Sequence, residues 1–545
     1  MSQALIKNGK TIVSGIDPAL RACKTADAFL IKDRTLYFCP SPVYGYGLSA
    51  LLSRIEKEAP SSAVLCVESD SELYELCRAN IDPSLSMNKK LHITNICEGG
   101  KLFSLVCDIW GVRTFRRVET IRFTGGWQLS PELYDSLFDH LRREIATDWS
   151  NALTLTKLGR LYIRNAVRNL AVLPRFSSIS NLSYGCKPVL VLGAGPSLDE
   201  TLDALSRNFT EVNRSFKIVC VDTCLGALKE RNITPDLAVI LESQHWNLRD
   251  FIGCRGWNVP AAADLSSLPS SVSMLGEDGY LFMTPWTNLR IFNRLKENNF
   301  LPAVIQPLGS VGLTAVEIAR SLTAGSIICA GLDFSFTADM YHCKGAPGYR
   351  TKLNTQNRFK RILNTIAYDD HSYSVSCKSG FPVFSSPVMR NYLNLFKQEF
   401  AGDSRLYDIE GSGLSLGVKT LSVNEMIKML KSDTEEFPYG QAEGEKECEF
   451  NNNSFNNPCI NSRLISFLQA ELKRLLELRC FLTGEEEADK ERFNVLVKEC
   501  DYLWAHFPDY AGGRAPDIKD ISFLNRFRAE LDPMIKLIEQ TMKRI

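Results

Sequence analysis

The sequence predicts an α/β protein with a central, doubly wound, Rossmann-like domain, an N-terminal α/β domain and a C-terminal helical bundle. Short apolar runs alternate with helical periodicity through the first 430 residues, which is typical of parallel sheets with crossover helices. After a polar, Asn-rich stretch, only helical periodicity remains. These observations divide the chain into residues 1–130, connecting helices over 131–185, a central domain over 186–430, a linker over 431–462 and a helical domain over 463–545.

Composition excludes several classes of protein. The 545 residues carry 63 Lys and Arg against 63 Asp and Glu, so no net charge favours binding to nucleic acid. No apolar run approaches the roughly 18 residues of a membrane span, and the first residues lack a signal-peptide pattern. We expect a cytoplasmic protein without a membrane span.

The cysteine pattern also favours a cytoplasmic protein. The 17 cysteines are scattered, and the closest pair, Cys220 and Cys224, is wider than Cys-x-x-Cys. None of the six histidines lies near a cysteine pair at zinc-ligand spacing. Reduced, mostly buried thiols are therefore expected, and structural zinc is not.

The N-terminal domain is predicted from strands at 35–39 and 63–68, each followed by a helix, at 48–56 and 71–78. A glycine-containing turn at 44–48 and Glu68 at the end of the second strand are faintly similar to a nucleotide or adenosylmethionine site. A domain used for packing or acceptor recognition is the favoured interpretation. Long helical periodicity from 131 to 172 then predicts the connecting helices.

The central domain is predicted from five strands with helices between several of them. The strand candidates lie at 189–192, 217–221, 237–241, 281–283 and 326–330, and one of the helices at 313–322. Such open sheets bind ligands beyond the carboxyl ends of their strands, so functional residues are sought there. The C-terminal domain is predicted from apolar residues at helical spacing over 464–476, 493–500 and 523–538.

A glycine turn follows the first central strand. Gly193, Gly195, Pro196 and Ser197 open a helix whose positive end and backbone N–H groups suit a phosphate. Leu198 stands where a dinucleotide fingerprint needs its third glycine, so nicotinamide or flavin binding is poorly supported. The alternative is structural, because Ser197 with Glu200 three residues later matches a capping box.

Other polar residues also follow predicted strands. Asp222, Thr223 and Glu242 follow the second and third strands, where carboxylates could orient a ribose or bind a metal. Gly309 and Ser310 precede a helix. Asp333 follows the last of the five strands, and His342 lies in the next loop as a candidate general base. Lys344 is a candidate for neutralising phosphate, with a surface lysine as the alternative.

Taken together, the order of these motifs resembles a known family. The motifs are the loop over 193–198, Asp222-Thr223, Pro235-Asp236, the turn over 309–311, Gly331-Leu332-Asp333 with His342, and Glu410-Gly411 before Gly417. Over about 230 residues the chain is similar to the Maf (motility-associated factor) proteins. Their central domain is related to archaeal 6-hydroxymethylpterin pyrophosphokinase (MptE-like), and their glycine loop is similar to the donor loop of some bacterial sialyltransferases.

The resemblance implies a glycosyltransferase that moves a nonulosonic acid, of the pseudaminic or legionaminic type, from a CMP-sugar to Ser or Thr of flagellin. The implied partners are flagellin, or a flagellin–chaperone complex, and the nucleotide sugar. By position, Gly193, Gly195, Pro196 and Ser197 would hold the phosphate, and Asp222 and Thr223 would lie beside the nucleoside. Gly309, Ser310, Asp333 and His342 would line the opposite wall.

Two alternatives stay open at this point. In the transferase, His342 is the first choice for general base, with Asp333 orienting or replacing it. In a pyrophosphokinase, the same loop would hold ATP, and Asp222, Glu242 or Asp333 would carry Mg²⁺. A non-catalytic flagellar scaffold would keep the sheet and bind no nucleotide.

Overall fold

The computed structural model describes residues 4–111, 113–209, 215–276, 279–359, 365–431, 459–483, 490–511 and 516–545. The described chain forms two compact units, Met1–Gly159 with Trp504–Phe523, and Arg160–Leu503 with Leu524–Ile545. The units are therefore not consecutive segments, because the chain returns to the first unit near its end. Most of the predicted linker over 431–462 lies outside the described residues.

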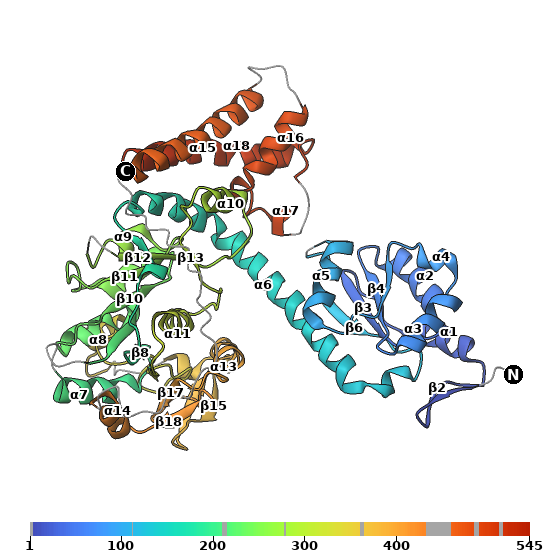
Figure 1. Cartoon of the computed structure of the whole chain (residues 1–545), viewed down its shortest axis with the longest axis horizontal. Coiled ribbons are helices and arrows are strands. Elements are labelled where there is room, and N and C mark those ends of the chain that lie inside the picture. The colour runs from blue at the N-terminus through green and yellow to red at the C-terminus, as the bar shows by residue number, and fades with distance from the viewer. Residues whose placement is uncertain are drawn as a thin grey trace. The chain divides into compact units, whose positions relative to one another are not determined.

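The first unit is built on a parallel sheet of order β5-β4-β3-β6 (Figure 1). Its strands are β3 (Thr35–Pro40), β4 (Ala63–Val67), β5 (Leu91–Thr94) and β6 (Arg117–Thr120). Its helices include α1 (Pro18–Ala28), α2 (Leu48–Glu58), α3 (Ser71–Asn80), α4 (Pro83–Ser86), α5 (Gly99–Trp110) and α17 (Pro508–Ala511). A hairpin of β1 (Leu5–Lys7) and β2 (Lys10–Val13) precedes them.

Alternate residues of the central strand β3 pack into two cores. Leu36 and Phe38 lie in a cluster with Leu102 of α5 and Leu137 of α6 (Pro131–Asn169). Tyr37 and Cys39 lie in another cluster, with residues of α1 and α2. Because both faces are covered, every residue of β3 is buried, as in most parallel sheets.

The second unit contains a larger parallel sheet of order β13-β12-β11-β10-β9-β8-β14-β17-β18, with β7 beside β12. The strands are β7 (Ser177–Ser178), β8 (Val189–Leu192), β9 (Lys217–Val221), β10 (Leu237–Ile240), β11 (Ala261–Asp264), β12 (Gly279–Met283), β13 (Ala303–Val304), β14 (Ile327–Ala330), β17 (Leu406–Ile409) and β18 (Lys419–Leu421). The chain runs outward from β8 to β13, then crosses to the other side of β8 and continues through β14, β17 and β18. This reversal between β8 and β14 is the switch point of a doubly wound sheet.

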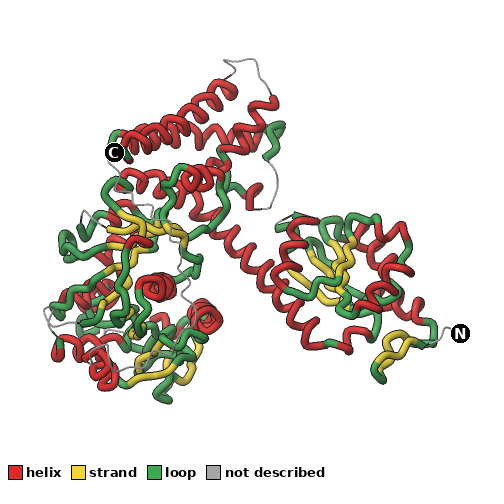
Figure 2. Tube along the Cα trace, in the orientation of Figure 1, coloured by secondary structure: helices red, strands yellow, loops and turns green. Residues whose placement is uncertain are grey.

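Helices pack around this sheet within the second unit (Figure 2). They include α7 (Leu198–Asn208), α8 (Leu225–Glu230), α9 (Pro269–Val272), α10 (Arg290–Glu297), α11 (Val311–Leu322), α12 (Pro347–Thr355), α13 (Pro387–Phe400) and α14 (Val423–Lys431). A short hairpin pairs β15 (Tyr373–Ser376) with β16 (Pro382–Ser385). The C-terminal region is helical, with α15 (Ile460–Thr483), α16 (Lys490–Glu499) and α18 (Ile521–Met542).

The predicted fold class is confirmed: the chain is α/β, with a large parallel sheet and a helical C-terminal region. Each of the five predicted central strands is present, within two residues at either end. The prediction missed β11, whose sequence Ala-Ala-Ala-Asp lacks the β-branched and aromatic residues that mark strands. Among the helices that the structure describes, none combines the length and apolar character that crossing a membrane requires.

Candidate functional site

The loop after β8 is held in place by the strand at the switch point. Gly195 N donates to the carbonyl oxygen of Gly331 at 2.8 Å, and Ser197 N donates to Asp333 Oδ2 at 2.7 Å. The Ser197 hydroxyl donates to the other oxygen, Oδ1. Asp333 is 3% exposed, so its carboxylate is a buried anchor for the loop. Burial raises the pKa of Asp333, while the hydrogen bonds from Ser197 oppose that shift.

The glycines of this loop are required by close backbone approach. A Cβ at Gly193 would lie 2.5 Å from the carbonyl oxygen of Gly331, and one at Gly195 would lie 2.5 Å from Asp333 Oδ2. Gly331 itself has a φ of +69°, in the left-handed region that favours glycine. The two strand ends can therefore meet only because glycine occupies these positions.

The capping-box prediction for Ser197 and Glu200 is wrong. Ser197 is the N-cap residue of α7, but its side chain makes no capping hydrogen bond, because its hydroxyl donates to Asp333. The backbone amides of Gly195 and Ser197, predicted to cradle a phosphate, also donate to protein acceptors here. The loop is thus held against the end of β14, and the assignment of phosphate to these amides stays a prediction.

The loop that carries His342 is joined to the glycine loop. Cys343 N donates to the carbonyl oxygen of Ala194 at 2.9 Å, which places His342 one residue from this contact. Lys344 N donates to both oxygens of Asp199 at 3.2 Å, while the Lys344 residue is exposed. The sequence predicted that His342 and the glycine loop lie at the same edge of the sheet. In the structure, the loop that carries His342 is hydrogen-bonded to the glycine loop.

Burial lowers the pKa of His342 to about 4, and the positive charge of Lys352 adds to the shift. The imidazole is therefore neutral at neutral pH, which is the state that a general base needs. The Tyr341 ring contacts it edge-on, with 4.8 Å between ring centroids. Since both oxygens of Asp333 accept from Ser197, this carboxylate is committed to the glycine loop.

Gly309 and Ser310 lie at the beginning of α11, at the same edge of the sheet. Gly309 has a φ of +70°, and Ser310 is the N-cap residue without a side-chain capping bond. In the first turn of this helix, a Cβ on Gly312 would lie 2.7 Å from Leu332 Cδ2, as would a Cβ on Gly193. The first turn of α11 and the glycine loop therefore contact the same side chain.

Asp222 and Thr223 lie at the end of β9, beside β8. Asp222 is 3% exposed and accepts from Thr223 N at 2.8 Å and from Asn247 Nδ2 at 2.6 Å. Asn247 Nδ2 also donates to Asp250 Oδ2 at 3.2 Å, so one buried amide bridges two carboxylates. Burial, together with the nearby Glu242 carboxylate, raises the pKa of Asp222 to about 6. Burial and the charge of Asp222 raise the pKa of Asp250 to about 7.

Asp222 and Glu242 were also predicted as candidate metal ligands. Glu242 is exposed, whereas Asp222 is buried against Asn247. Within the described part of the chain, no group of three or more His, Cys, Asp or Glu residues is arranged to hold a metal ion. Mg²⁺ binding therefore stays a prediction.

Sequence reasoning missed several residues that shape this edge. Lys378 Nζ donates to Asp408 Oδ1 at 2.6 Å, and both side chains are at least nine-tenths buried. A Cβ on Gly413 would lie 2.7 Å from Asp333 Oδ1, so the turn after β17 closes over the same carboxylate. Asn165 of α6 donates from Nδ2 to the carbonyl oxygens of Ser243 and Ser266. These two hydrogen bonds hold the loops after β10 and β11 against α6. Only the glycine-rich sequence over 410–413 gave a signal in advance.

The faint nucleotide-site pattern of the N-terminal domain has a packing explanation. Glu68 is 1% exposed, and its carboxylate accepts from Ser41 Oγ at 2.6 Å and from Tyr134 Oη at 3.2 Å. A Cβ at Gly47 would lie 2.7 Å from the Phe123 ring. These contacts favour the packing role over a cofactor site.

Comparison with known proteins identifies the central part of the chain. Residues 162–339 match the family model described as 6-hydroxymethylpterin diphosphokinase MptE-like. These residues form an MptE-like domain. The MptE-like domain carries the switch point, the glycine loop, Asp222 and Asp333, and it confirms the predicted resemblance for this region.

Two further matches span nearly the whole chain. An uncharacterized protein of Treponema pallidum (strain Nichols) is 28% identical over 522 residues, covering 94% of this chain and 89% of its own length. The solved structure of MAf glycosyltransferase from Magnetospirillum magneticum AMB-1 is 13% identical with a TM-score of 0.49. That match covers 100% of this chain and 85% of the solved one.

Proposed function

We propose that the chain is a glycosyltransferase that moves a nonulosonic acid of the pseudaminic or legionaminic type from a CMP-sugar to Ser or Thr of flagellin. In this function the protein supports flagellum assembly and motility. The observation that carries the proposal is the junction of the glycine loop, Asp333 and the His342 loop at the switch point of the MptE-like domain. The Maf-like order of motifs over about 230 residues supports the same activity.

Phosphate binding is best assigned to the first turn of α11. The amides of Gly195 and Ser197 are engaged by protein acceptors, whereas Ser310 makes no side-chain capping bond at this helix. The first N–H groups of a helix have no partner within the helix, and they lie at its positive end. The CMP phosphate would sit there, beside the glycine loop, which packs against the same Leu332 side chain as this turn.

In the transfer step, the acceptor hydroxyl attacks the anomeric carbon of the sugar, and the bond from that carbon to the CMP phosphate oxygen breaks. His342 accepts the hydroxyl proton, and the electron pair of the broken bond leaves with CMP. The low pKa of His342 belongs to the ligand-free protein. A bound anionic donor beside the imidazole raises its pKa, because opposite charge favours the protonated form.

A second candidate function is an ATP-dependent pyrophosphokinase that acts on a 6-hydroxymethylpterin-like substrate. The description of the family model that matches residues 162–339 favours it. In this reaction, Asp222, Glu242 or Asp333 would bind Mg²⁺ between the ATP phosphates.

Thermal unfolding in the presence of CMP, CTP, UDP or ATP, each with and without Mg²⁺, separates these functions. A ligand at 100 times its dissociation constant adds about 2.7 kcal/mol to stability. Stabilisation by CMP or CTP without metal supports the transferase. Stabilisation by ATP with Mg²⁺ alone supports the pyrophosphokinase, and no stabilisation by any nucleotide supports a non-catalytic scaffold.

The assignment of the base is tested by His342→Ala in a transfer assay with purified CMP-sugar and flagellin. We expect a loss of about a hundredfold or more in kcat, because a positioned base contributes at least that factor. His371→Ala provides the control, since His371 is an exposed histidine of the same unit. Unchanged transfer by His342→Ala would remove His342 from the mechanism.

A further inference from the structure

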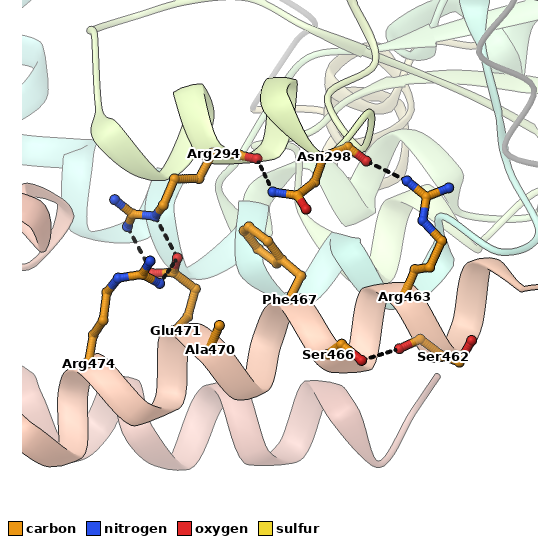
Figure 3. A pocket seen from close by; sticks show the side chains of 9 residues that line it. All are labelled: Arg294, Asn298, Ser462, Arg463, Ser466, Phe467, Ala470, Glu471 and Arg474. Carbon is orange, nitrogen blue, oxygen red and sulfur yellow. Dashed lines mark hydrogen bonds and ion pairs between the residues drawn. The ribbon is translucent and has the colours of Figure 1, made fainter.

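A pocket of about 390 Å³ lies between α10 and α15, away from the sheet edge described above (Figure 3). All of its lining residues belong to the second unit. They are Arg294 and Asn298 on the α10 side, and Ser462, Arg463, Ser466, Phe467, Ala470, Glu471 and Arg474 on α15. The lining combines three guanidinium groups with one carboxylate.

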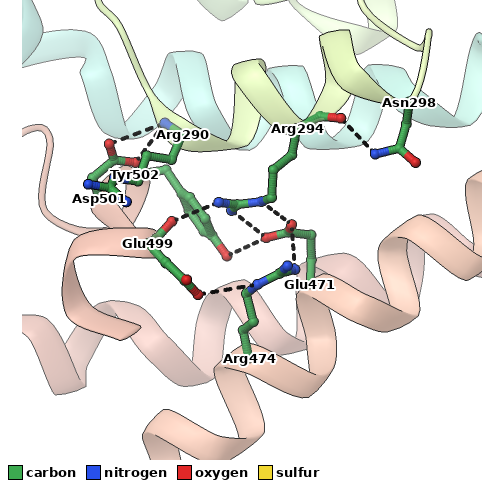
Figure 4. Close-up of polar contacts among 8 residues, drawn as sticks. All are labelled: Arg290, Arg294, Asn298, Glu471, Arg474, Glu499, Asp501 and Tyr502. Atoms are coloured by element: carbon green, nitrogen blue, oxygen red, sulfur yellow. Dashed lines mark hydrogen bonds and ion pairs between the residues drawn. The ribbon is translucent and has the colours of Figure 1, made fainter. Parts of the chain in front are cut away.

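At one end of the pocket, the charged side chains are paired with one another (Figure 4). The Glu471 side chain is fully buried and accepts from Arg294 Nε at 2.6 Å, from Arg294 Nη2 at 2.8 Å and from Arg474 Nη1 at 3.0 Å. Tyr502 Oη lies 3.4 Å from the same carboxylate, and Glu499 lies 3.5 Å from Arg474 Nε. Buried, fully bonded charges of this kind hold side chains in one geometry.

The other end of the pocket carries the guanidinium of Arg463. Arg463 Nη2 donates to the carbonyl oxygen of Asn298 at 2.9 Å, and the guanidinium stacks on the Phe300 ring at 5.3 Å. Among the described residues, no carboxylate lies within ion-pair distance of Arg463. A guanidinium has five N–H donors, so most of them stay available to a ligand. The lining has three guanidiniums and one carboxylate, and when the neighbouring Glu499 is included, one positive charge remains.

The spacing of these groups identifies the shape of the ligand. Arg463 and Arg474 are 11 residues apart on one helix, which corresponds to about 16 Å at 1.5 Å per residue. Phe467 and Ala470 line the stretch between them (Figure 3). A single phosphate would fill only the Arg463 end of the groove, whereas an extended peptide of about five residues spans its whole length at about 3.3 Å per residue.

We propose that this groove binds a short acidic peptide segment of a partner protein, with a carboxylate on Arg463 and an apolar side chain over Phe467 and Ala470, the peptide running from there toward Arg474. Charge-assisted, often bidentate hydrogen bonds make Arg the preferred residue for capturing a carboxylate. The site is separate from the proposed catalytic edge, and the proposal does not depend on the transferase reaction.

The test is fluorescence anisotropy with the full chain and a labelled pentapeptide, Glu-Ala-Leu-Ala-Glu, against its Gln-Ala-Leu-Ala-Gln counterpart. Neither peptide has a side-chain hydroxyl and no sugar donor is present, so the result is independent of the proposed transferase. We expect the acidic peptide to bind about tenfold more tightly, and its affinity to fall as salt is raised. Equal binding of the two peptides, or binding of neither, would overturn the proposal.

Variants locate the site. Arg463→Gln should weaken binding of the acidic peptide about tenfold, whereas Arg479→Gln, an exposed arginine of the same helix outside the groove, should leave it unchanged. Ala470→Glu adds bulk and negative charge at an exposed helix position and should abolish binding with little effect on folding. Equal losses in the two arginine variants would overturn the assignment. Displacement of the peptide by equimolar pyrophosphate would instead assign the groove to a small anion.

Discussion

Asp333 shows how one buried carboxylate sets the position of a loop. Both of its oxygens accept from Ser197, and the turns at Gly195 and Gly413 approach it so closely that no side chain fits between. A carboxylate with these contacts acts as a structural anchor for the candidate site. Its loss should therefore affect stability as well as ligand binding.

Asp333→Ala leaves the part-buried Ser197 amide and hydroxyl without their acceptor. We expect the free energy of unfolding to fall by about 2 kcal/mol, since an unpaired buried polar group costs about 1–3 kcal/mol. Ser197→Ala keeps the amide contact and should cost less, about 1 kcal/mol. Urea unfolding of both variants measures the difference, and a larger loss for Ser197→Ala would contradict this account.

The raised pKa values of Asp222 and Asp250 should make the free energy of unfolding depend on pH. Their folded pKa values, about 6 and about 7, lie above the usual Asp value near 3.9, so folding favours their neutral forms. This contribution is complete below pH 4 and is lost as the pH rises through 7. Asp250→Asn stays neutral, so it should melt at least about 2 °C above the wild type at pH 8, with a smaller difference at pH 4.

Asp369→Asn is the matched control for this measurement, because Asp369 is an exposed aspartate in the same unit. Its melting temperature should follow that of the wild type at both pH values. A gain for Asp250→Asn that is the same at pH 4 and pH 8 would show that ionisation of this pair is not the cause.

At the scale of elements, strand ends and the turns that follow them are packed against one another. The loop after β8 bonds to the end of β14, and the turn after β17 covers the same carboxylate. Parallel strands bring these turns to one edge, so residues more than 200 positions apart become neighbours.

Gly413→Ala tests this packing. The added Cβ would lie 2.7 Å from Asp333 Oδ1 and 2.9 Å from Asp333 Cα, so the turn or the strand end must move. We expect a destabilisation of about 1–3 kcal/mol, the usual cost of overpacking. Gly402→Ala is the control, because its Cβ would meet nothing within 4 Å. Equal unfolding midpoints for the two variants would contradict the predicted clash.

The strands and helices differ in how well they could be predicted from the sequence. The strands β8, β9, β10 and β14 are apolar runs followed by glycine or acidic residues, so both their positions and the polar residues at their ends were predictable. The short strands β11 and β13 carry little such signal, since three alanines or two residues do not distinguish a strand. The anchoring by Asn165 was not predictable either, because a helical Asn gives no sign of the loops it will contact.

For the whole molecule, the division into two units predicts which residues a bound ligand should protect from hydrogen exchange. Every residue of the candidate site and of the acidic-peptide groove belongs to the second unit. The first unit has its own sheet and its own cores. The return of residues Trp504–Phe523 to the first unit was not visible in the sequence, because helical periodicity does not say which core a helix joins.

Hydrogen exchange with and without CMP tests this division. We expect slower exchange at residues 193–199, 222–224, 309–314 and 331–345, since a bound ligand suppresses local opening. Exchange in the sheet formed by β3 to β6 should not change. Protection confined to the first unit, measured by mass spectrometry of peptides, would refute the placement of the nucleotide site.

The sequence by itself determined the α/β class, the positions of the principal strands, and the cluster of glycine and polar residues that follows them. These features depend on local periodicity and on residue types that only certain backbone positions accept. Tertiary structure decided which groups are already bonded: Asp333 holds Ser197, Asn247 joins Asp222 to Asp250, and Glu471 bonds two arginines, while no carboxylate of the described residues pairs with Arg463. Hydrogen bonds and burial depend on neighbours brought together by folding, and a local pattern contains no information about those neighbours.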